Sequence, residues 1–515
     1  MLKKKVIVLL LFLVLMVQAG CQDQTGEIES AGSTNPKMRF TYWVPLEEPE
    51  ELVISSLEEN EVYKELVRRT GIEFDFISVK REHAEEAFNL MLASGDLPDI
   101  IQNPPHYYGG SEKAVRDGIY LKLNDLIDRH APNFKRLLDN NPQIKKEVQN
   151  DLGTIWGFPL VHLEEEPSWY GPIIREDWLE ELGLGVPETI EEWYDVLKAF
   201  KEEKGAEVPL LFRDNYSTDN AWSILSAYGV TKSFVKVDDI VLYGPIQPAY
   251  KAFLKEMNQW YEEGLIDSDF AMRNYVSFSE MAVSGKAGAW FGRYGEDLDD
   301  FLIRGQRLNP QYRLTAAPYP SLKKGDRPEY RQKNWLVQGY WGVITSSCQY
   351  PVEIVKWFDY HYSDEAFVLF NYGVEGVSYD LVEGKPVYKD FISNNEDGYG
   401  YYVLREKYKW RCPYIRDFRA VPLQREEVRK AQEIWTNSAG DALVIPPVSL
   451  LPTESVEYEK IMDGVQYYVE EMTVRFIMGI ENIENFDDYV KRVKALGIDR
   501  AVAIRQAALN RYNSR

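Results

Sequence analysis

The sequence predicts an α/β fold in which strands and helices alternate along the chain. Apolar residues recur at every second position in 38–43 and again in 72–76, which is the pattern of a strand. Helical patterns occupy 61–69 and 83–93, and the short apolar run 99–101 is typical of a strand in a parallel sheet. Strand, helix, strand, helix and strand at this spacing predict βαβ units with right-handed crossovers.

Further helices are predicted later in the chain. Thr189 and Glu192 have the spacing of a capping box at the start of a helix. The apolar stripe of 250–261 ends before Gly264, a residue that commonly terminates helices. The last hundred residues are mostly helical in pattern, as in 486–493. Short apolar runs suited to more strands recur at 209–212, 287–291 and 340–345.

Residues 1–20 have the layout of an export signal. Lysines at 3–5 precede the uncharged apolar run 6–17. This run is shorter than the roughly 20 residues that a membrane-spanning helix needs. We therefore predict a cleaved signal peptide rather than a permanent membrane span.

The end of the signal resembles the lipobox of bacterial lipoproteins. The small residues Ala19 and Gly20 come just before Cys21, the position that is acylated in such proteins. The usual aliphatic residue three positions before the cysteine is replaced by Gln18, so an ordinary secretory signal with an incidental cysteine stays the alternative. Residues 21–37 are polar and predict a flexible tether.

Composition and charge limit the function classes. The chain has 82 acidic and 59 basic residues, a net charge of −23, which argues against nucleic acid as a partner. Hydrophobic residues at 45% exclude a disordered chain. Three cysteines cannot form a disulfide framework, and the sequence leaves open whether Cys348 and Cys412 pair.

Common catalytic motifs are not found in the sequence. There is no CxxC, HExxH, GxSxG, P-loop or GxGxxG motif, so no cofactor is predicted. With so many acidic residues, a pair of carboxylates suited to a glycosidase carries almost no information. The five histidines are far apart in the chain, a poor basis for a metal site: His83, His106, His130, His162 and His361.

Aromatic residues are the strongest functional signal, with 34 Tyr and 13 Trp. An aromatic ring can pack against the C–H face of a sugar while polar side chains bind its hydroxyls. Several aromatic pairs lie near the ends of predicted strands, where ligands of open α/β sheets bind: Tyr42–Trp43, Trp169–Tyr170, Trp290–Tyr294 and Tyr340–Trp341. Core packing is the alternative for each ring, and it is our assignment for Trp193, Trp260 and Trp357.

Several segments resemble the extracellular solute-binding proteins of bacterial ABC importers, in particular the large lipoprotein, oligosaccharide-type branch. The longest is GPIIREDWLEELGLGVPETIEEWYDVLKAFK at 171–201. The others follow in the same order along nearly the whole chain: SGDLPDII at 94–101, 250–270, 370–386 and 476–498.

The resemblance implies a two-lobed periplasmic-binding-protein-like fold, each lobe a mostly parallel sheet flanked by helices and joined by hinge strands. It implies hinge crossings at 156–163 and 316–320. The lobes would be 38–158 with 330–375, and 159–329 with 376–515. Such a protein is not an enzyme: it captures a carbohydrate in the cleft and delivers it to the permease subunits of an ABC transporter. We expect a monomer, held by lipid on Cys21 at the extracellular face of a Gram-positive-type cell membrane.

The candidate ligand-binding residues combine positions that the resemblance places at the cleft with aromatic residues near predicted strand ends, such as Tyr170 and Trp290. They are Trp43, Asn103, His162, Tyr170, Arg213, Asn215, Tyr216, Trp290, Arg293, Tyr294, Gln338, Tyr340, Trp341 and Glu375. Arg213 and Arg293, with Arg273, suggest an acidic sugar such as a uronate as a hypothesis. Relatives in an alginate-binding branch carry an acidic calcium loop after the position of Lys201, where this chain has KEEKGAEVP. We therefore expect no metal.

Two other function classes remain open at this stage. One is a secreted carbohydrate-active enzyme, a glycoside hydrolase or lyase that uses a pair of carboxylates. The other is a lipoprotein receptor or adhesin with a protein partner.

Overall fold

The first β-sheet contains the strands predicted at the start of the folded part. The computed structural model describes residues 38–46, 53–212, 224–392, 401–410, 412–421 and 425–515. The sheet has the order β11-β3-β1-β2, with strands β1 (Met38–Leu46), β2 (Ile72–Lys80), β3 (Ile100–Gln102) and β11 (Gly342–Ile344). β1 pairs in parallel with β2 and β3, and β11 is antiparallel to β3.

Helices α2 (Glu61–Thr70) and α3 (Ala84–Ser94) connect these strands, which confirms the predicted βαβ units. The ends of α2 follow from local chemistry. The side chain of Asn60 accepts hydrogen bonds from the first backbone N–H groups of α2. Gly71 ends the helix at φ 71°, a conformation that glycine adopts without strain.

The second sheet is mixed. Its order is β10-β5-β9-β6, with strands β5 (Tyr170–Arg175), β6 (Val208–Leu211), β9 (Ala287–Arg293) and β10 (Leu314–Ala316). β6 and β9 are parallel, whereas β5 is antiparallel to β9 and β10 is antiparallel to β5. The α/β class is therefore confirmed, but a mostly parallel arrangement is wrong for this sheet. β5 is the first strand of this sheet along the chain. Its antiparallel pairing with β9 is not that of a βαβ unit.

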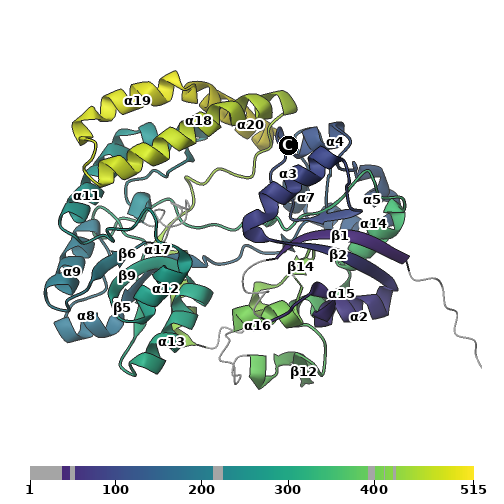
Figure 1. Ribbon diagram of the computed structural model, residues 1–515, viewed down its shortest axis with the longest axis horizontal. Helices are drawn as coiled ribbons and strands as arrows, with labels where there is room; N and C mark the ends of the chain where they lie inside the picture. The colour runs from purple at the N-terminus through teal and green to yellow at the C-terminus, as the bar shows by residue number, and fades with distance from the viewer. Residues whose placement is uncertain (1–37, 47–52, 213–223, 393–400, 411, 422–424) are drawn as a thin grey trace, which may run out of the picture. The chain divides into compact units, whose positions relative to one another are not determined.

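The helices divide between the two sheets, as Figure 1 shows. With the first sheet pack α4 (Gly110–Arg116), α5 (Asn124–His130), α6 (Pro132–Asn140), α7 (Pro142–Val148), α14 (Pro351–Tyr360) and α15 (Asp364–Tyr372). With the second pack α8 (Glu176–Leu182), α9 (Ile190–Glu202), α11 (Pro248–Glu262), α12 (Tyr275–Val283), α13 (Asp300–Leu308), α17 (Glu426–Ser438), α18 (Pro452–Ile477), α19 (Phe486–Ala495) and α20 (Ile498–Ser514). The capping box at Thr189 and Glu192 is present at the start of α9.

Small strand pairs complete the fold. β7 (Phe234–Val237) pairs with β8 (Ile240–Tyr243), and β12 (Tyr379–Val382) pairs with β13 (Lys385–Tyr388). β4 (Val161–His162) and β14 (Ile415–Arg416) form a short parallel pair between the two large sheets. No helix among the described residues is long and apolar enough to cross a membrane.

Each sheet has its own hydrophobic core. Trp357 packs edge-on against Tyr42 in the first core, with ring centroids 6.2 Å apart. Trp193 and Trp260 are buried in the second core. All three tryptophans assigned to the interior are therefore buried. Cys348 and Cys412 are buried as free thiols in the first core, and Cys21 lies outside the described residues.

Residues after α15 return to the first core. Trp410 and Tyr414 belong to the cluster that contains Tyr42 and Trp357. They follow α16 (Tyr401–Tyr408), which contacts α2. The predicted lobe boundaries stay a prediction, and this packing leads us to propose that the first lobe also includes 401–416.

Close packing in the second core predicts that Gly171→Ala destabilises the protein. A Cβ on Gly171 would lie 2.5 Å from the indole of Trp435, which is fully buried. The indole must move, at a cost of about 1–3 kcal/mol in the free energy of unfolding. Gly185→Ala is the control, because no atom lies within 4 Å of a Cβ built there. Urea unfolding of both variants checks the prediction, which equal stabilities would contradict.

Candidate functional site

A ribbon of extended segments connects the two sheets. Segments 156–169 and 332–342 run antiparallel: Phe158 N–H donates to Gly342 O (2.9 Å), and Gly342 N–H donates back (2.8 Å). Further along, His162 N–H donates to Leu336 O (2.8 Å). β14 adds a third segment through its parallel pairing with β4.

The segment 156–163 does lie in this ribbon, whereas 316–320 does not. Ala316 is the last residue of β10, and Ala317 N–H donates to Pro172 O (3.0 Å) at the edge of the second sheet. The predicted second crossing at 316–320 is therefore wrong. The chain leaves the second sheet later and crosses through 332–342.

The partly exposed tryptophans gather in the ribbon. Among the tryptophans that the structure describes, eight are buried. The other four are half-buried and all lie in the two antiparallel segments: Trp156, Trp169, Trp335 and Trp341. In the described part of the chain, indole surface that is neither core nor fully solvated thus lies in the connection between the sheets.

Neighbouring groups hold these rings in place. Trp156 stacks on Trp341, with centroids 4.3 Å apart and planes at 29°. Trp169 Nε1 donates to Asn334 Oδ1 (2.8 Å), and the guanidinium of Arg293 lies 5.7 Å from its ring centre. The ammonium of Lys333 lies 4.8 Å from the ring of Trp335. Such fixed rings can receive a flat apolar face of a ligand at little cost in conformational entropy.

A buried polar network lies beneath the rings. Glu166 accepts hydrogen bonds from Asn334 Nδ2 (2.9 Å) and from Arg416 (3.2 Å). Asn334 also accepts the indole N–H of Trp169, so the network ties this ring to Arg416 on β14. Burial raises the pKa of Glu166, and Arg416 acts in the opposite direction. The three segments of the ribbon are therefore joined by side chains as well as by backbone.

His162 lies in the same place without a hydrogen bond to either ring nitrogen. Its Nε2 is 4.0 Å from Glu166. Burial, with a smaller effect from Arg416, lowers the pKa of the imidazole to about 3. At neutral pH the ring is therefore uncharged, and its contact with Glu166 is not an ion pair.

Residues 55–366 match the family model of bacterial extracellular solute-binding proteins. The chain belongs to this family. The matched range includes the second sheet and both antiparallel segments of the ribbon.

Individual relatives of this solute-binding protein are distant. The fructooligosaccharide ABC transporter substrate-binding protein FusA of Streptococcus pneumoniae is 26% identical over 335 residues, 61% of this chain and 60% of FusA. The chain thus spans less than two thirds of that relative. The polygalacturonan/rhamnogalacturonan-binding protein YtcQ of Bacillus subtilis is 26% identical over 394 residues, 73% and 75% of the two chains.

Among solved structures, the alginate-binding protein AlgQ2 without calcium ion superposes with a TM-score of 0.78. It is 24% identical, and the match covers 93% of this chain and 99% of that one. The likeness establishes the fold, which is the two-lobed fold of solute-binding proteins.

Four of the aromatic residues predicted to bind ligand are buried. Trp43, Tyr170, Trp290 and Tyr294 have exposed fractions of 2%, 1%, 0% and 4% and pack within the two cores. Trp290, for example, donates its indole N–H to Asp297 O at 3.1 Å. Nearness to a strand end did not reveal which face of the strand each ring occupies.

Other predicted residues do meet at the ribbon. Asn103 N–H donates to Trp341 O (2.6 Å), and Asn103 and Tyr340 have positive φ angles of 44° and 47°. Such strained backbone is common at binding sites. Gln338 donates to Trp335 O (3.3 Å). His162, Arg293 and the pair Tyr340–Trp341 are also in or beside the ribbon.

The remaining predicted residues fall elsewhere. Glu375 is exposed and lines a surface pocket beside α2 and α15. Arg213, Asn215 and Tyr216 lie outside the described residues. Arg273 is bound by Asp267 and Asp269 and is therefore already neutralised, which removes one basis of the acidic-sugar hypothesis.

Sequence reasoning did not select five residues of the site: Trp156, Glu166, Trp335, Asn334 and Arg416. Each stands alone in the sequence without a motif around it. They meet because three distant segments run side by side. The only available signal was the placement of Trp156 and Trp335 outside any amphipathic pattern.

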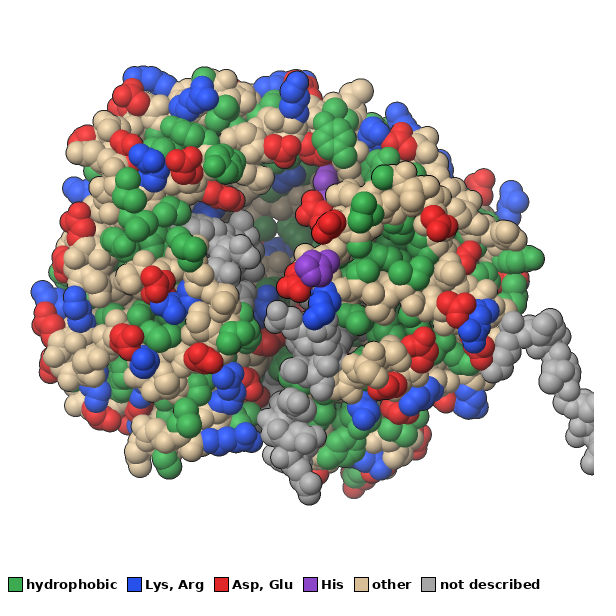
Figure 2. Space-filling model, in the orientation of Figure 1, with side chains coloured by type: hydrophobic (Ala, Val, Ile, Leu, Met, Phe, Trp, Pro, Cys, Tyr) green, Lys and Arg blue, Asp and Glu red, His purple; other side chains and the backbone are tan. Residues whose placement is uncertain are grey.

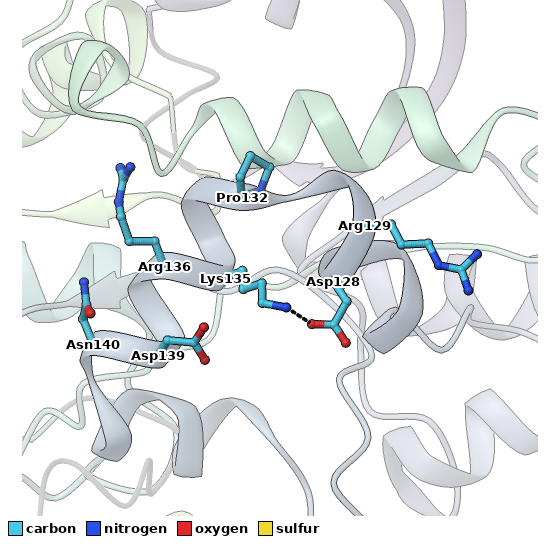
Figure 3. A pocket seen from close by; sticks show the side chains of 7 residues that line it. All are labelled: Asp128, Arg129, Pro132, Lys135, Arg136, Asp139 and Asn140. Atoms are coloured by element: carbon cyan, nitrogen blue, oxygen red, sulfur yellow. Dashed lines mark hydrogen bonds and ion pairs between the residues drawn. The ribbon is translucent and has the colours of Figure 1, made fainter.

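Other surface features are weaker candidates for a sugar-binding site than the ribbon. Figure 2 shows a face that is hollowed near its centre and has acidic and basic side chains interspersed. A hollow of about 430 Å³ lies on α5 and α6. Figure 3 shows its lining side chains, among which Lys135 pairs with Asp128 (2.6 Å). Its lining is polar and has no aromatic ring, which suits hydrated surface better than a sugar site.

The expectation that the protein binds no metal remains a prediction. No group of three or more His, Cys, Asp or Glu side chains among the described residues could hold an ion. Around the segment 201–208, Lys204 pairs with Glu181, and Glu207 pairs with Lys286 at 2.9 Å. Lys204 and Glu207 thus have charged partners within the protein.

The buried imidazole predicts a pH-dependent stability that His162→Leu should reduce. Unfolded chains bind a proton at histidine near pH 6.5, while folded His162 does so only near pH 3. Stability therefore falls as the pH falls between these values. His162→Leu removes this effect, so relative to wild type the variant should gain about 2 kcal/mol between pH 7 and pH 5.

Urea unfolding of both proteins at the two pH values measures this difference. The other buried histidine, His361, is present in both and cancels. An unchanged pH dependence in the variant would contradict the assignment.

Proposed function

We propose that the chain is a lipid-anchored extracellular binding protein that captures a carbohydrate, in particular an oligosaccharide, between its lobes. It then delivers the sugar to the permease of an ABC transporter. The observation that carries this proposal is the placement of the half-buried tryptophans in the segments that join the two sheets. Membership of the extracellular solute-binding family supports it, as does the similarity to FusA and YtcQ, whose names describe sugar-binding proteins.

Capture needs no chemistry in this proposal. A sugar that contacts both lobes favours the closed arrangement over the open one and shifts the population between them. The ribbon is the element about which the lobes would turn, because short extended segments can absorb changes in backbone angle.

A secreted carbohydrate-active enzyme is the alternative function. It needs two carboxylates free to act on one glycosidic bond. In the ribbon, Glu166 is already held by Asn334 and Arg416, which favours a structural role for this carboxylate. We therefore retain the binding function and propose that the chain is not an enzyme.

The first test is binding of oligosaccharides to the protein from residue 38 onwards. A bound sugar should raise the melting temperature and remain intact after incubation. Release of new reducing ends would instead indicate the enzyme, and a melting temperature indifferent to every oligosaccharide of a broad panel would refute the proposal.

A variant then tests the aromatic surface. Trp335 packs in none of the hydrophobic clusters formed by the described residues, so Trp335→Ala should fold normally. Loss of its stacking should weaken sugar binding by about 1–2 kcal/mol, measured by calorimetry. Tyr467→Ala is the matched control, because Tyr467 is 73% exposed on α18 and outside the ribbon. Equal affinities of the two variants would argue against a role for Trp335.

The lipid anchor has its own test. Cys21→Ser removes the thiol that would carry the lipid. The variant expressed in a Gram-positive host should lose incorporation of labelled fatty acid and appear in the medium. Retention of the label would assign the modification to another residue.

A further inference from the structure

A small pocket adjoins the ribbon on the side of the first core. It lies between α16, β14 and the residue before Trp341. Its polar lining includes Tyr340, Tyr401, Arg405, Glu406, Lys409 and Arg416. Three of these side chains are cations and one is an acid, although the protein as a whole carries a net charge of −23.

Two of the three cations have a carboxylate partner. Arg405 Nε lies 2.8 Å from Glu406, and Arg416 lies 3.2 Å from Glu166. Lys409 differs: its ammonium donates to the hydroxyl of Tyr401 at 3.1 Å. Among the described residues, none places a carboxylate within ion-pair distance of this ammonium.

An ammonium in such surroundings lacks compensation. Burial lowers the pKa of Lys409, Tyr401 acts against this, and the nearby guanidinium groups of Arg416 and Arg405 lower it further. A phenol hydroxyl offers a dipole but no negative charge, so the charged ammonium is poorly stabilised. An anion placed in the pocket would supply the missing partner and would interact with Arg416 as well.

The size of the pocket limits the anion. Its free volume is about 60 Å³. One water in the liquid occupies roughly 30 Å³, so the space suits a carboxylate and does not admit a whole sugar ring. The ring would remain outside, beside Tyr340, whose strained backbone (φ 47°) is followed directly by the half-buried Trp341.

The side chains around Arg416 link the pocket to the aromatic surface. Arg416 binds Glu166, Glu166 accepts from Asn334, and Asn334 accepts the indole N–H of Trp169. A ligand with an acid group in the pocket could therefore lay its rings along the tryptophans of the ribbon.

We infer that this pocket, with Lys409 at its centre, binds the carboxylate of an acidic sugar unit. This inference rests on the proposed sugar-binding function and specifies its substrate class as a uronate-containing oligosaccharide. The sequence suggested Arg213, Arg273 and Arg293 as the cations that bind an acidic sugar. We now propose Lys409 and Arg416 for this role.

The test compares charged and neutral forms of the same sugars by calorimetry. The probes are oligogalacturonates and oligomannuronates, their methyl esters, and neutral oligosaccharides of the same length. The acidic forms should bind, and esterification should weaken binding about 10- to 100-fold, because a charge-assisted hydrogen bond is lost. Acetate and inorganic phosphate test whether any free anion suffices.

Variants test whether the preference for acidic sugars depends on Lys409. Lys409→Met should reduce affinity for the acidic sugars about 10- to 100-fold and leave that for their esters unchanged. Lys409→Arg keeps the charge and should restore part of the binding. Lys407→Met is the matched control: it removes the same charge from the neighbouring turn, where Lys407 lies against Tyr408 and does not line the pocket.

The outcomes separate the two proposals. Equal binding of acids and esters, or acid binding unaffected by Lys409→Met, would overturn the inference and leave the sugar-binding function standing. Binding of acetate or phosphate as tightly as of the uronates would replace the sugar by a free anion. A protein that binds no sugar of either kind would refute the proposed function itself. Should Lys409→Met fail to fold, the comparison of acids with esters on the wild-type protein still decides.

Discussion

The hydrogen-bonded pairing of 156–169 with 332–342 is the constraint on which the rest of the structure depends. Each sheet has its own core, and the first core also takes in apolar residues of these segments, but packing alone does not fix how the two segments align. The paired backbone groups do so, since Phe158 and Gly342 exchange two hydrogen bonds and β14 joins β4 beside them. A single extended segment would leave its polar groups unsatisfied, whereas the pairing satisfies them while Phe158, Leu160 and Val161 pack into the first core.

Several charged and polar side chains are buried in the ribbon, and they depend on one another for compensation. Glu166 and Arg416 are held together at 3.2 Å, and removing either partner would leave a buried charge without compensation. His162 beside them is neutral because its pKa is lowered by burial. Lys409 and Tyr401 continue this polar region toward α16. Charged and polar groups thus lie together in and beside the ribbon, next to the apolar side chains that pack into the first core.

Tryptophan serves two purposes in this protein, and exposure separates them. Trp193, Trp260 and Trp290 fill the second lobe, where a large apolar ring contributes most when fully buried. Trp156 and Trp341 stack on each other at the ribbon and keep part of their surface in solvent. This chain thus has aromatic surface in the segments that connect its two sheets, beside groups that can form hydrogen bonds.

The sequence by itself determined the local elements. Periodicity predicted β1, β2, β3, α2 and α3, because an amphipathic pattern reflects which face of an element is buried. The capping box at Thr189 depends on neighbours within four residues and was equally readable. The resemblance to a family then extended the prediction to two lobes, since a fold is shared by relatives whose sites differ.

Only the tertiary structure decided which residues form the site. Trp43 and Trp290 follow the same strand-end pattern as Trp341, yet the first two point into the cores and the third lies in the ribbon. The mixed pairing of the second sheet and the meeting of Glu166, Asn334 and Arg416 likewise depend on contacts between residues up to 250 positions apart. Such contacts leave no local pattern in the sequence, because each residue is compatible with its own segment and acquires its role only from residues that the fold brings beside it.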